Sequence, residues 1–263
     1  MTAARRRVRA PKHPLEVPPQ PAPPALRQSE TTVPSRSARQ PRVDRLTAPV
    51  EDYLKTIYEI ERAGSAAATN DIAQRLEIAP ASVSGMVRRL ADDGLLAYEK
   101  YRGVRLTPTG RRAALRTIRR HRVIEAYLVH ALGFAWDGVH EEAERLEHAA
   151  SDVLIDRMAM AIGEPVTDPH GAPIPTREGT VDETPLRTLA DAAVGERVRL
   201  VRVNDEDPGL LRYLSSLGLH PDVVVRVRGR APYDGPITLD VAGKRRQVGA
   251  ALAVGLQVEA VKT

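Results

Sequence analysis

The 263-residue sequence contains no cysteine, and its aromatic residues number only nine: one Phe, one Trp and seven Tyr. The absence of cysteine excludes disulfide bonds, cysteine-ligated zinc ribbons, iron–sulfur clusters and thiol catalysis. The sequence also lacks a run of about 18 apolar residues and the charged-then-apolar pattern of a secretory leader. Because 42% of the residues are hydrophobic, we expect two or three small domains with buried cores, in a soluble cytoplasmic protein.

Positive charge and proline are concentrated at the N-terminus. Residues 1–49 hold ten basic and three acidic residues, a net charge of +7, whereas residues 50–263 hold 29 basic and 31 acidic residues, a net charge of −2. The same segment contains ten of the 21 prolines and no aromatic residue, so it buries too little apolar surface to offset its ordering entropy. We predict a disordered tail over 1–49, which either attracts nucleic acid non-specifically or is a solvated extension.

Residues 50–118 follow the element order of a winged helix-turn-helix. Apolar spacing predicts helices over 50–63 and 81–93 with a short helix from residue 70 between them, and then two short strands around 101–103. In this motif the third helix enters the DNA major groove and the hairpin reaches the neighbouring backbone. The alternative is a set of ordinary solvated charges. The candidate DNA contacts lie on the turn, the third helix and the wing: Ala79, Pro80, Ala81, Ser82, Ser84, Gly85, Arg88, Arg89 and Arg102.

Two more helices are predicted beyond the wing, over 109–132 and 139–162. The second carries an apolar stripe at three- and four-residue steps, made of Val139, Ala143, Leu146, Ala150, Val153, Leu154 and Met158. We interpret residues 119–163 as a helical dimerisation domain, because a palindromic operator requires two-fold protein symmetry. A proline-rich linker follows over 164–190, and alternating apolar residues then predict a small β-barrel over 191–263. The fold class is therefore α+β.

Histidine and glutamate gather on the second of these helices. At about 100° per residue, His140, Glu144, Glu147 and His148 fall within an arc of about 100°, and the one cation nearby, Arg145, points elsewhere. On the preceding helix a second pair of donors, His121 and Glu125, is spaced i,i+4. Neutral imidazoles and carboxylates together are typical ligands of a divalent metal ion; the alternative is a charged helix surface with incidental histidines. No nucleophile–base pair stands out, so we do not expect an enzyme.

Several segments of the chain resemble the diphtheria-toxin-repressor family of metal-dependent transcriptional repressors. They are residues 51–58, 98–103, 120–122, 139–148 and 168–171. The resemblance spans about 50–263 and is closest to the manganese-responsive branch, in the long form with a C-terminal SH3-like, FeoA-like barrel. It implies a homodimeric repressor of metal-uptake genes that binds a double-stranded, palindromic DNA operator with Mn²⁺ as corepressor. An Fe²⁺-responsive repressor, or a winged-helix regulator sensing a non-metal ligand, is the alternative.

The resemblance also implies two sets of metal ligands. The primary set is Asp52, Glu144, Glu147 and His148, and the ancillary set is His121, Glu125, His140 and Asp207. Asp207 is the best match to a carboxylate from the barrel, although Asp205 and Glu206 adjoin it. Iron-responsive relatives carry Met at the position of Asp52 and Cys at that of Glu144, so the hard oxygen donors here favour Mn²⁺. Short manganese regulators have Glu where this chain has Lys55, which favours two separate sites over a bridged pair of ions.

Overall fold

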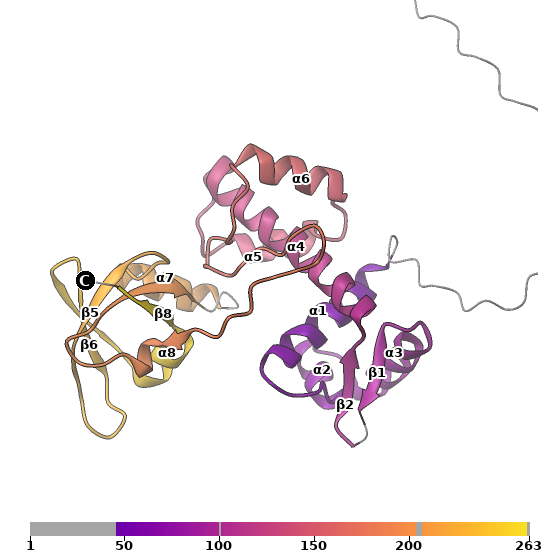
Figure 1. Cartoon of the computed structure of the whole chain (residues 1–263), viewed down its shortest axis with the longest axis horizontal. Helices are drawn as coiled ribbons and strands as arrows, with labels where there is room; N and C mark the ends of the chain where they lie inside the picture. The colour runs from indigo at the N-terminus through magenta and orange to yellow at the C-terminus, as the bar shows by residue number, and fades with distance from the viewer. Residues whose placement is uncertain (1–45, 100, 204–206, 262–263) are drawn as a thin grey trace, which may run out of the picture. The chain divides into compact units, whose positions relative to one another are not determined.

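The computed structural model describes residues 46–99, 101–203 and 207–261 (Figure 1). The predicted tail over 1–49 lies outside the described residues as far as residue 45. Its last two residues, Ala48 and Pro49, instead form the start of helix α1, because proline is favoured in the first turn of a helix. Within the described ranges no helix is both long and apolar enough to cross a membrane.

The element order predicted for the winged helix-turn-helix is confirmed. It runs α1 (Ala48–Arg62), α2 (Thr69–Arg75), α3 (Pro80–Asp92), β1 (Leu96–Glu99) and β2 (Gly103–Leu106). Strands β1 and β2 pair antiparallel, from Leu96 opposite Leu106 to Glu99 opposite Gly103. Gly94, with φ +72°, follows the end of α3, where the left-handed backbone that ends many helices favours glycine.

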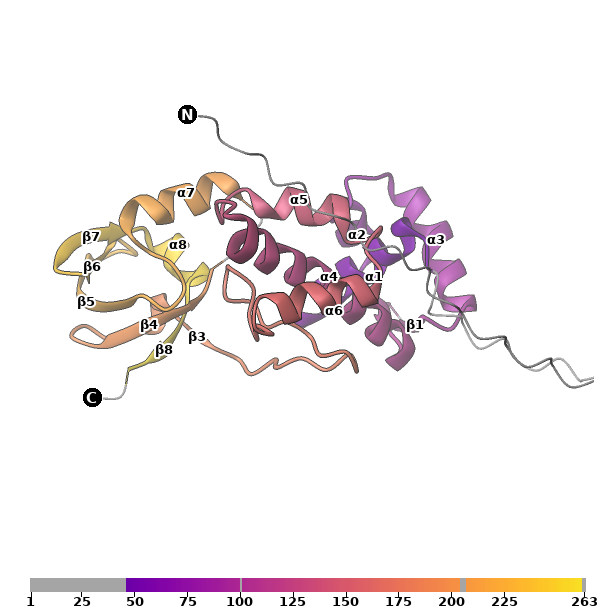
Figure 2. The same ribbon diagram turned by 90° about the horizontal axis from the view of Figure 1, so that it is seen from above.

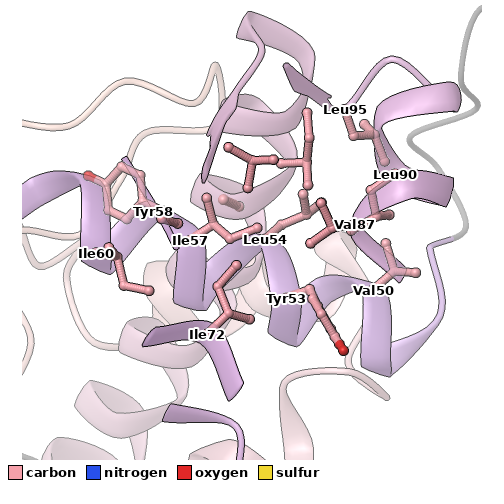
Figure 3. Close-up of a cluster of buried hydrophobic side chains, with 14 of the residues drawn as sticks. Val50, Tyr53, Leu54, Ile57, Tyr58, Ile60, Ile72, Val87, Leu90 and Leu95 are labelled. Carbon is pink, nitrogen blue, oxygen red and sulfur yellow. The ribbon is translucent and has the colours of Figure 1, made fainter. Parts of the chain in front are cut away.

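A compact apolar cluster holds α1 against α3 and β1. Leu54, Ile57 and Leu90 are completely buried in it, and Figure 3 shows Leu54 between Ile57 and Val87. The apolar positions of α1 recur at three- and four-residue steps, so they share one helical face. Asp52 is therefore left near the opposite face of α1, half-buried and outside this core.

Helix α4 (Pro108–Leu132) is shared between the winged helix and the next domain. Thr107 caps it by accepting a hydrogen bond from the Gly110 N–H at 3.1 Å, and Gly133 ends it in the left-handed conformation. Its 25 residues rise about 1.5 Å each, which makes it about 37 Å long. It packs first on α1 and then on the next two helices, so the predicted boundary at residue 118 falls inside one continuous helix.

The single helix predicted over 139–162 is wrong, because the chain forms two helices there: α5 (Val139–Leu146) and α6 (Asp152–Ala161). Ser151 begins the second one by accepting a hydrogen bond from the Leu154 N–H at 3.3 Å, a typical N-cap. Helices α4 and α5 lie side by side (Figures 1 and 2).

This break divides the apolar stripe that we assigned to the dimer interface. Val139 and Ala143 are fully buried against α4, so their assignment to an interface is corrected. Val153 is 72% exposed and Leu154 47% exposed, which leaves an apolar surface on α6 for a partner.

The C-terminal domain contains a six-stranded antiparallel sheet, in agreement with the predicted small β-barrel. Its order is β3-β8-β4-β5-β6-β7. The strands are β3 (Arg187–Thr188), β4 (Arg197–Arg202), β5 (Val224–Arg230), β6 (Ile237–Val241), β7 (Lys244–Val248) and β8 (Gln257–Ala260). A 3₁₀ turn (Leu189–Asp191) and two helices, α7 (Pro208–Leu217) and α8 (Ala250–Gly255), complete it. All of these elements except β3 contribute to one apolar core. The α+β class is confirmed.

Candidate metal centre and DNA-reading surface

Three of the four predicted primary ligands converge from two helical regions. His148, just after α5, places its Nε2 atom 2.8 Å from Asp52 Oδ1 of α1 and 3.5 Å from Glu147 Oε1. Glu147 is completely buried. These three side chains offer ligand atoms within 4.8 Å of one another. Burial raises the pKa of Asp52, a direction that a nearby cation opposes. The residues therefore fit a divalent metal ion.

Three predicted ancillary ligands form a tight triangle beside this group. His121 Nε2 lies 3.0 Å from Glu125 Oε1 and 3.1 Å from His140 Nδ1, and the third side of the triangle measures 3.3 Å. Adjacent donors on one octahedral ion with bonds of about 2.1 Å are about 3.0 Å apart. The other carboxylate oxygen of Glu125, Oε2, is buried and accepts no hydrogen bond from the described residues. This donor set also fits a divalent cation.

The ring of His121 connects the two sets of ligands. Its Nε2 belongs to the ancillary triangle, whereas its Nδ1 lies 2.5 Å from Glu147 Oε2. Burial opposes a charge on the ring, but hydrogen bonds to Glu125 and Glu147 raise the pKa of His121 to about 9. In the metal-free protein the two carboxylates therefore share a protonated imidazole.

Glu144, predicted as a primary ligand, lies with two ancillary residues, since its ligand atom is within 4.8 Å of those of His121 and His140. Its Oε1 atom is 3.7 Å from His121 Nδ1 and 3.8 Å from His140 Nε2, and it accepts a 2.6 Å hydrogen bond from the ammonium of Lys55. Burial lowers the pKa of Lys55, but the charges of Glu147 and Glu144 outweigh it, so the net shift is upward. The side chain of Glu144 is 42% exposed, which leaves it more freedom to turn than the buried ligands have.

Glu51 is a residue of the site that the sequence did not reveal. Its Oε2 atom lies 2.7 Å from His148 Nδ1, and its Oε1 accepts a 3.0 Å hydrogen bond from Arg120. A carboxylate on one ring nitrogen fixes the tautomer and orientation of the other, as around many metal-binding histidines. Glu51 thus aims His148 Nε2 at Asp52. Its position directly before Asp52, about 100° around α1, was the available signal.

The segment 168–171 supports Glu125 from the far side. His170 is fully buried, with its Nε2 donating to the Trp136 carbonyl at 2.8 Å and its Nδ1 lying 3.8 Å from Glu125 Oε2. Asp168 Oδ1 accepts the backbone N–H groups of His170 and Ala172, both at 2.9 Å. Asp168 is thereby committed to shaping this turn.

Asp207 does not join the ancillary ligands, contrary to our expectation. Its carboxylate caps α7 by accepting the Gly209 N–H at 2.7 Å, and among the described residues no contact links it to His121, Glu125 or His140. The neighbouring Asp205 and Glu206, which the sequence left as alternatives, lie outside the described residues.

The predicted DNA-reading residues form one exposed surface. The eight candidates on the α3 turn and helix are all exposed, as is Arg102 on the wing: Ala79, Pro80, Ala81, Ser82, Ser84, Gly85, Arg88, Arg89 and Arg102. On the same helix the apolar residues Val83, Val87 and Leu90, spaced by four and three positions, are buried. Arg102 lies 3.4 Å from Glu99 of the wing, a weak exposed pair that leaves the guanidinium accessible.

Comparison with known protein families accounts for each of the three folded regions. Residues 45–104 match the iron dependent repressor, N-terminal DNA binding domain; residues 107–176 match the iron dependent repressor, metal binding and dimerisation domain; and residues 187–260 match the FeoA domain. The chain is 33% identical to the diphtheria toxin repressor of Corynebacterium diphtheriae over 81% of its own length and 98% of that protein. It belongs to the diphtheria-toxin-repressor family.

Some members of the diphtheria-toxin-repressor family are named for iron and others for manganese. The iron-dependent repressor IdeR of Mycobacterium tuberculosis is 32% identical over 76% of this chain and 92% of that protein. A solved manganese-dependent transcriptional repressor in complex with manganese is 37% identical, with a TM-score of 0.73 over 81% of this chain and all of that one. The structure of ScaR with bound Zn²⁺ gives 33% identity and a TM-score of 0.70 over 81% of this chain and 99% of that one.

Membership in the diphtheria-toxin-repressor family establishes the general activity. The chain is a metal-dependent transcriptional repressor that binds DNA and dimerises, and it is not an enzyme. Our alternative from the sequence, a winged-helix regulator that senses a non-metal ligand, is thereby excluded. The metal that this member uses is a separate question, because relatives named for iron and for manganese are similarly close.

Proposed function

We propose that this repressor responds to manganese and controls genes for metal-ion uptake, with Mn²⁺ as its corepressor. The observation that carries the proposal is the contact between Asp52 of the DNA-reading domain and His148 of the metal-binding domain, at 2.8 Å. A ligand set drawn from both domains makes the arrangement of one depend on the other. Asp52 offers an oxygen donor, and the chain has no cysteine to supply a thiolate, which suits Mn²⁺.

We assign two sets of ligands to this function. The primary set is Asp52, Glu144, Glu147 and His148, and the ancillary set is His121, Glu125 and His140. The second set is supported by the 3.0–3.3 Å triangle of ancillary donors and by the buried Glu125 oxygen that accepts no hydrogen bond from the described residues. A bound divalent ion supplies the converging carboxylates with positive charge beyond that of Lys55.

The residues then act by holding two domains together. Asp52 and Glu147 carry like charges that repel each other, and the ion pair of Lys55 with Glu147 offsets this repulsion only in part. With their charge neutralised, Asp52 keeps the DNA-reading domain in one orientation. In a homodimer the two α3 helices are then spaced to read a palindromic operator. DNA must in turn raise the affinity for the metal ion by the same factor.

The DNA contacts in this proposal come from the exposed α3 surface and the wing. Ser82 and Ser84 lie in the first turns of α3 and are placed for phosphate contacts, while Arg88 and Arg89 lie further along the helix. Arg102 extends from the wing toward the neighbouring backbone of the duplex.

Iron(II) is the second candidate, since the curated relatives at 32–33% identity include iron-dependent repressors. Carboxylate and imidazole donors also accept Fe²⁺, whose intrinsic affinity for such ligands is above that of Mn²⁺. Selection between the ions therefore depends on coordination number and geometry rather than on ligand type alone.

The test is DNA binding at controlled metal concentration. A duplex is selected by the wild-type protein from a random pool, and its affinity is then measured with Mn²⁺, Fe²⁺, Co²⁺ and Zn²⁺ at matched free concentration and fixed salt. We expect the Asp52→Ala variant to lose metal-dependent binding but to remain a dimer, whereas Glu141→Ala, an exposed acidic residue of α5, keeps it. Wild-type metal-bound affinity in Asp52→Ala would refute the mechanism, and a stronger response to Fe²⁺ than to Mn²⁺ would assign iron.

A further inference from the structure

The ammonium group of Lys55 occupies the space between the two sets of ligands. Its Nζ atom lies 2.6 Å from Glu144 Oε1, 3.1 and 3.2 Å from the two oxygens of Glu147, and 3.3 Å from His121 Nδ1. The Lys55 side chain is only 13% exposed. Three potential metal ligands thus share one cation that is part of the chain.

We propose that Lys55 is a built-in countercharge, which holds Glu144 and Glu147 in place without metal and competes with a metal ion for Glu144. This inference rests on the proposed function, since it concerns the affinity of the same site. It makes Lys55 a positioning residue that sets the metal concentration at which the repressor responds.

The competition follows from the contacts of Glu144. Its Oε1 atom is the closest neighbour of the ammonium, and a metal ion that uses this oxygen must replace a charge-assisted hydrogen bond. Because a hydrogen bond to a charged group is stronger than a neutral one, the replacement weakens metal binding by about tenfold or more, which is about 1.4 kcal/mol or more. Asp52 and His148 contact each other at 2.8 Å, so this part of the site keeps its own contact when Glu144 exchanges partners.

Lys55 and its carboxylate partners belong to different domains. It extends from α1 of the DNA-reading domain, whereas Glu144 lies on α5 and Glu147 directly follows it. The ion pairs at 2.6 and 3.1 Å therefore connect the two domains in the metal-free protein. Because Glu147 is completely buried, its charge would otherwise be costly there. Without metal, the two domains are consequently connected by these ion pairs, more weakly than a bound metal ion would connect them.

Three variants of the full-length protein test this. Lys55→Met removes the charge and keeps the length, Lys55→Arg keeps a charge, and Arg62→Met removes a positive charge two turns further along α1. Each chelator-stripped protein is titrated calorimetrically with Mn²⁺, and its thermal melting is recorded without metal. We expect Lys55→Met to bind Mn²⁺ about tenfold more tightly and to melt at a lower temperature without metal. Lys55→Arg stays near wild type in both measurements, as does Arg62→Met.

Unchanged Mn²⁺ affinity or unchanged metal-free melting in Lys55→Met overturns the inference. Equal shifts in the Met and Arg variants also overturn it, because they would reflect packing rather than charge. If Lys55→Met is unfolded without metal, Lys55→Gln is titrated in its place under the same criteria. A wild-type protein that binds none of Mn²⁺, Fe²⁺, Co²⁺ or Zn²⁺ would instead defeat the proposed function, so the two failures are distinguishable.

Discussion

Replacing Glu51 with Gln tests whether the orientation of His148 is part of the metal site. The carboxylate accepts a hydrogen bond from Arg120 on one oxygen and lies 2.7 Å from His148 Nδ1 on the other. An amide of the same size has only one oxygen, so its NH₂ group faces either the guanidinium or the Nδ1–H of the ring. Glu51→Gln therefore leaves His148 less well aimed at Asp52.

The expected size of the effect comes from these contacts. Loss of the partner on the far nitrogen of a metal-binding histidine weakens metal affinity by about 10–100-fold, which is about 1.4–2.7 kcal/mol. The ion pair with Arg120 is 10% exposed on each side, and breaking a buried pair is costly. Arg120 retains Asp152 at 2.9 Å, so we expect a loss of about 1–3 kcal/mol in folding stability.

The assay is calorimetric Mn²⁺ titration at a temperature where circular dichroism shows each variant folded. Glu141→Gln, exposed on α5, is the matched control and should bind like wild type. The weakening should affect one site per chain and spare the site of His121 and His140. A folded Glu51→Gln protein with wild-type affinity at both sites would show that Glu51 does not orient the ligand.

Three further predictions concern pH, packing and assembly. The hydrogen bonds that raise the pKa of His121 from 6.5 to about 9 stabilise the metal-free fold. This contribution is fully present below about pH 6.5 and is lost as the pH rises through 9. A metal-free melting temperature that does not fall between pH 7 and 10 contradicts the shift. Gly110→Ala places a Cβ 2.1 Å from the Leu95 carbonyl oxygen and should lower the free energy of unfolding in a denaturant titration by about 1–3 kcal/mol. In Gly85→Ala the Cβ meets nothing within 4 Å, so the free energy of unfolding should rise by up to about 1 kcal/mol. Equal effects of the two substitutions would refute the packing argument. Val153→Asp, at a 72% exposed apolar position, should shift the dimer toward monomer in sedimentation, and an unchanged dimer would place the interface elsewhere.

The helices and strands were predictable where a periodic apolar pattern met clear end signals. Helix α4 differs from its predicted bounds by one residue, and the alternating apolar residues predicted to form a small β-barrel over 191–263 lie in one antiparallel sheet. The break between α5 and α6 was missed because the apolar spacing continues through it, although Ser151 followed by Asp152 is an N-terminal signal. Strand β7 was missed because its sequence, Lys-Arg-Arg-Gln-Val, offers no alternation, as befits a charged edge strand.

Helical spacing was enough to anticipate that His140, Glu144, Glu147 and His148 take part in ligand groups, but the structure divides them between two groups and ends α5 at Leu146. Nothing local to the sequence indicates that Lys55 reaches between them, since its contacts are separated by 66–92 positions along the chain. The role of Asp207 as the cap of α7 was equally unpredictable, because no helical repeat relates Asp207 to the ancillary ligands.

The continuity of α4 makes the phase of that helix a constraint on the chain. One residue inserted midway turns everything beyond it by about 100° and advances it by about 1.5 Å. Arg111 and His121 lie on opposite sides of such an insertion point: one contacts Tyr58 of the DNA-reading domain, and the other belongs to the ligand triangle. Relatives that differ in length should therefore place their insertions in loops and leave this rod intact, because even a single added residue would put the two ends out of alignment.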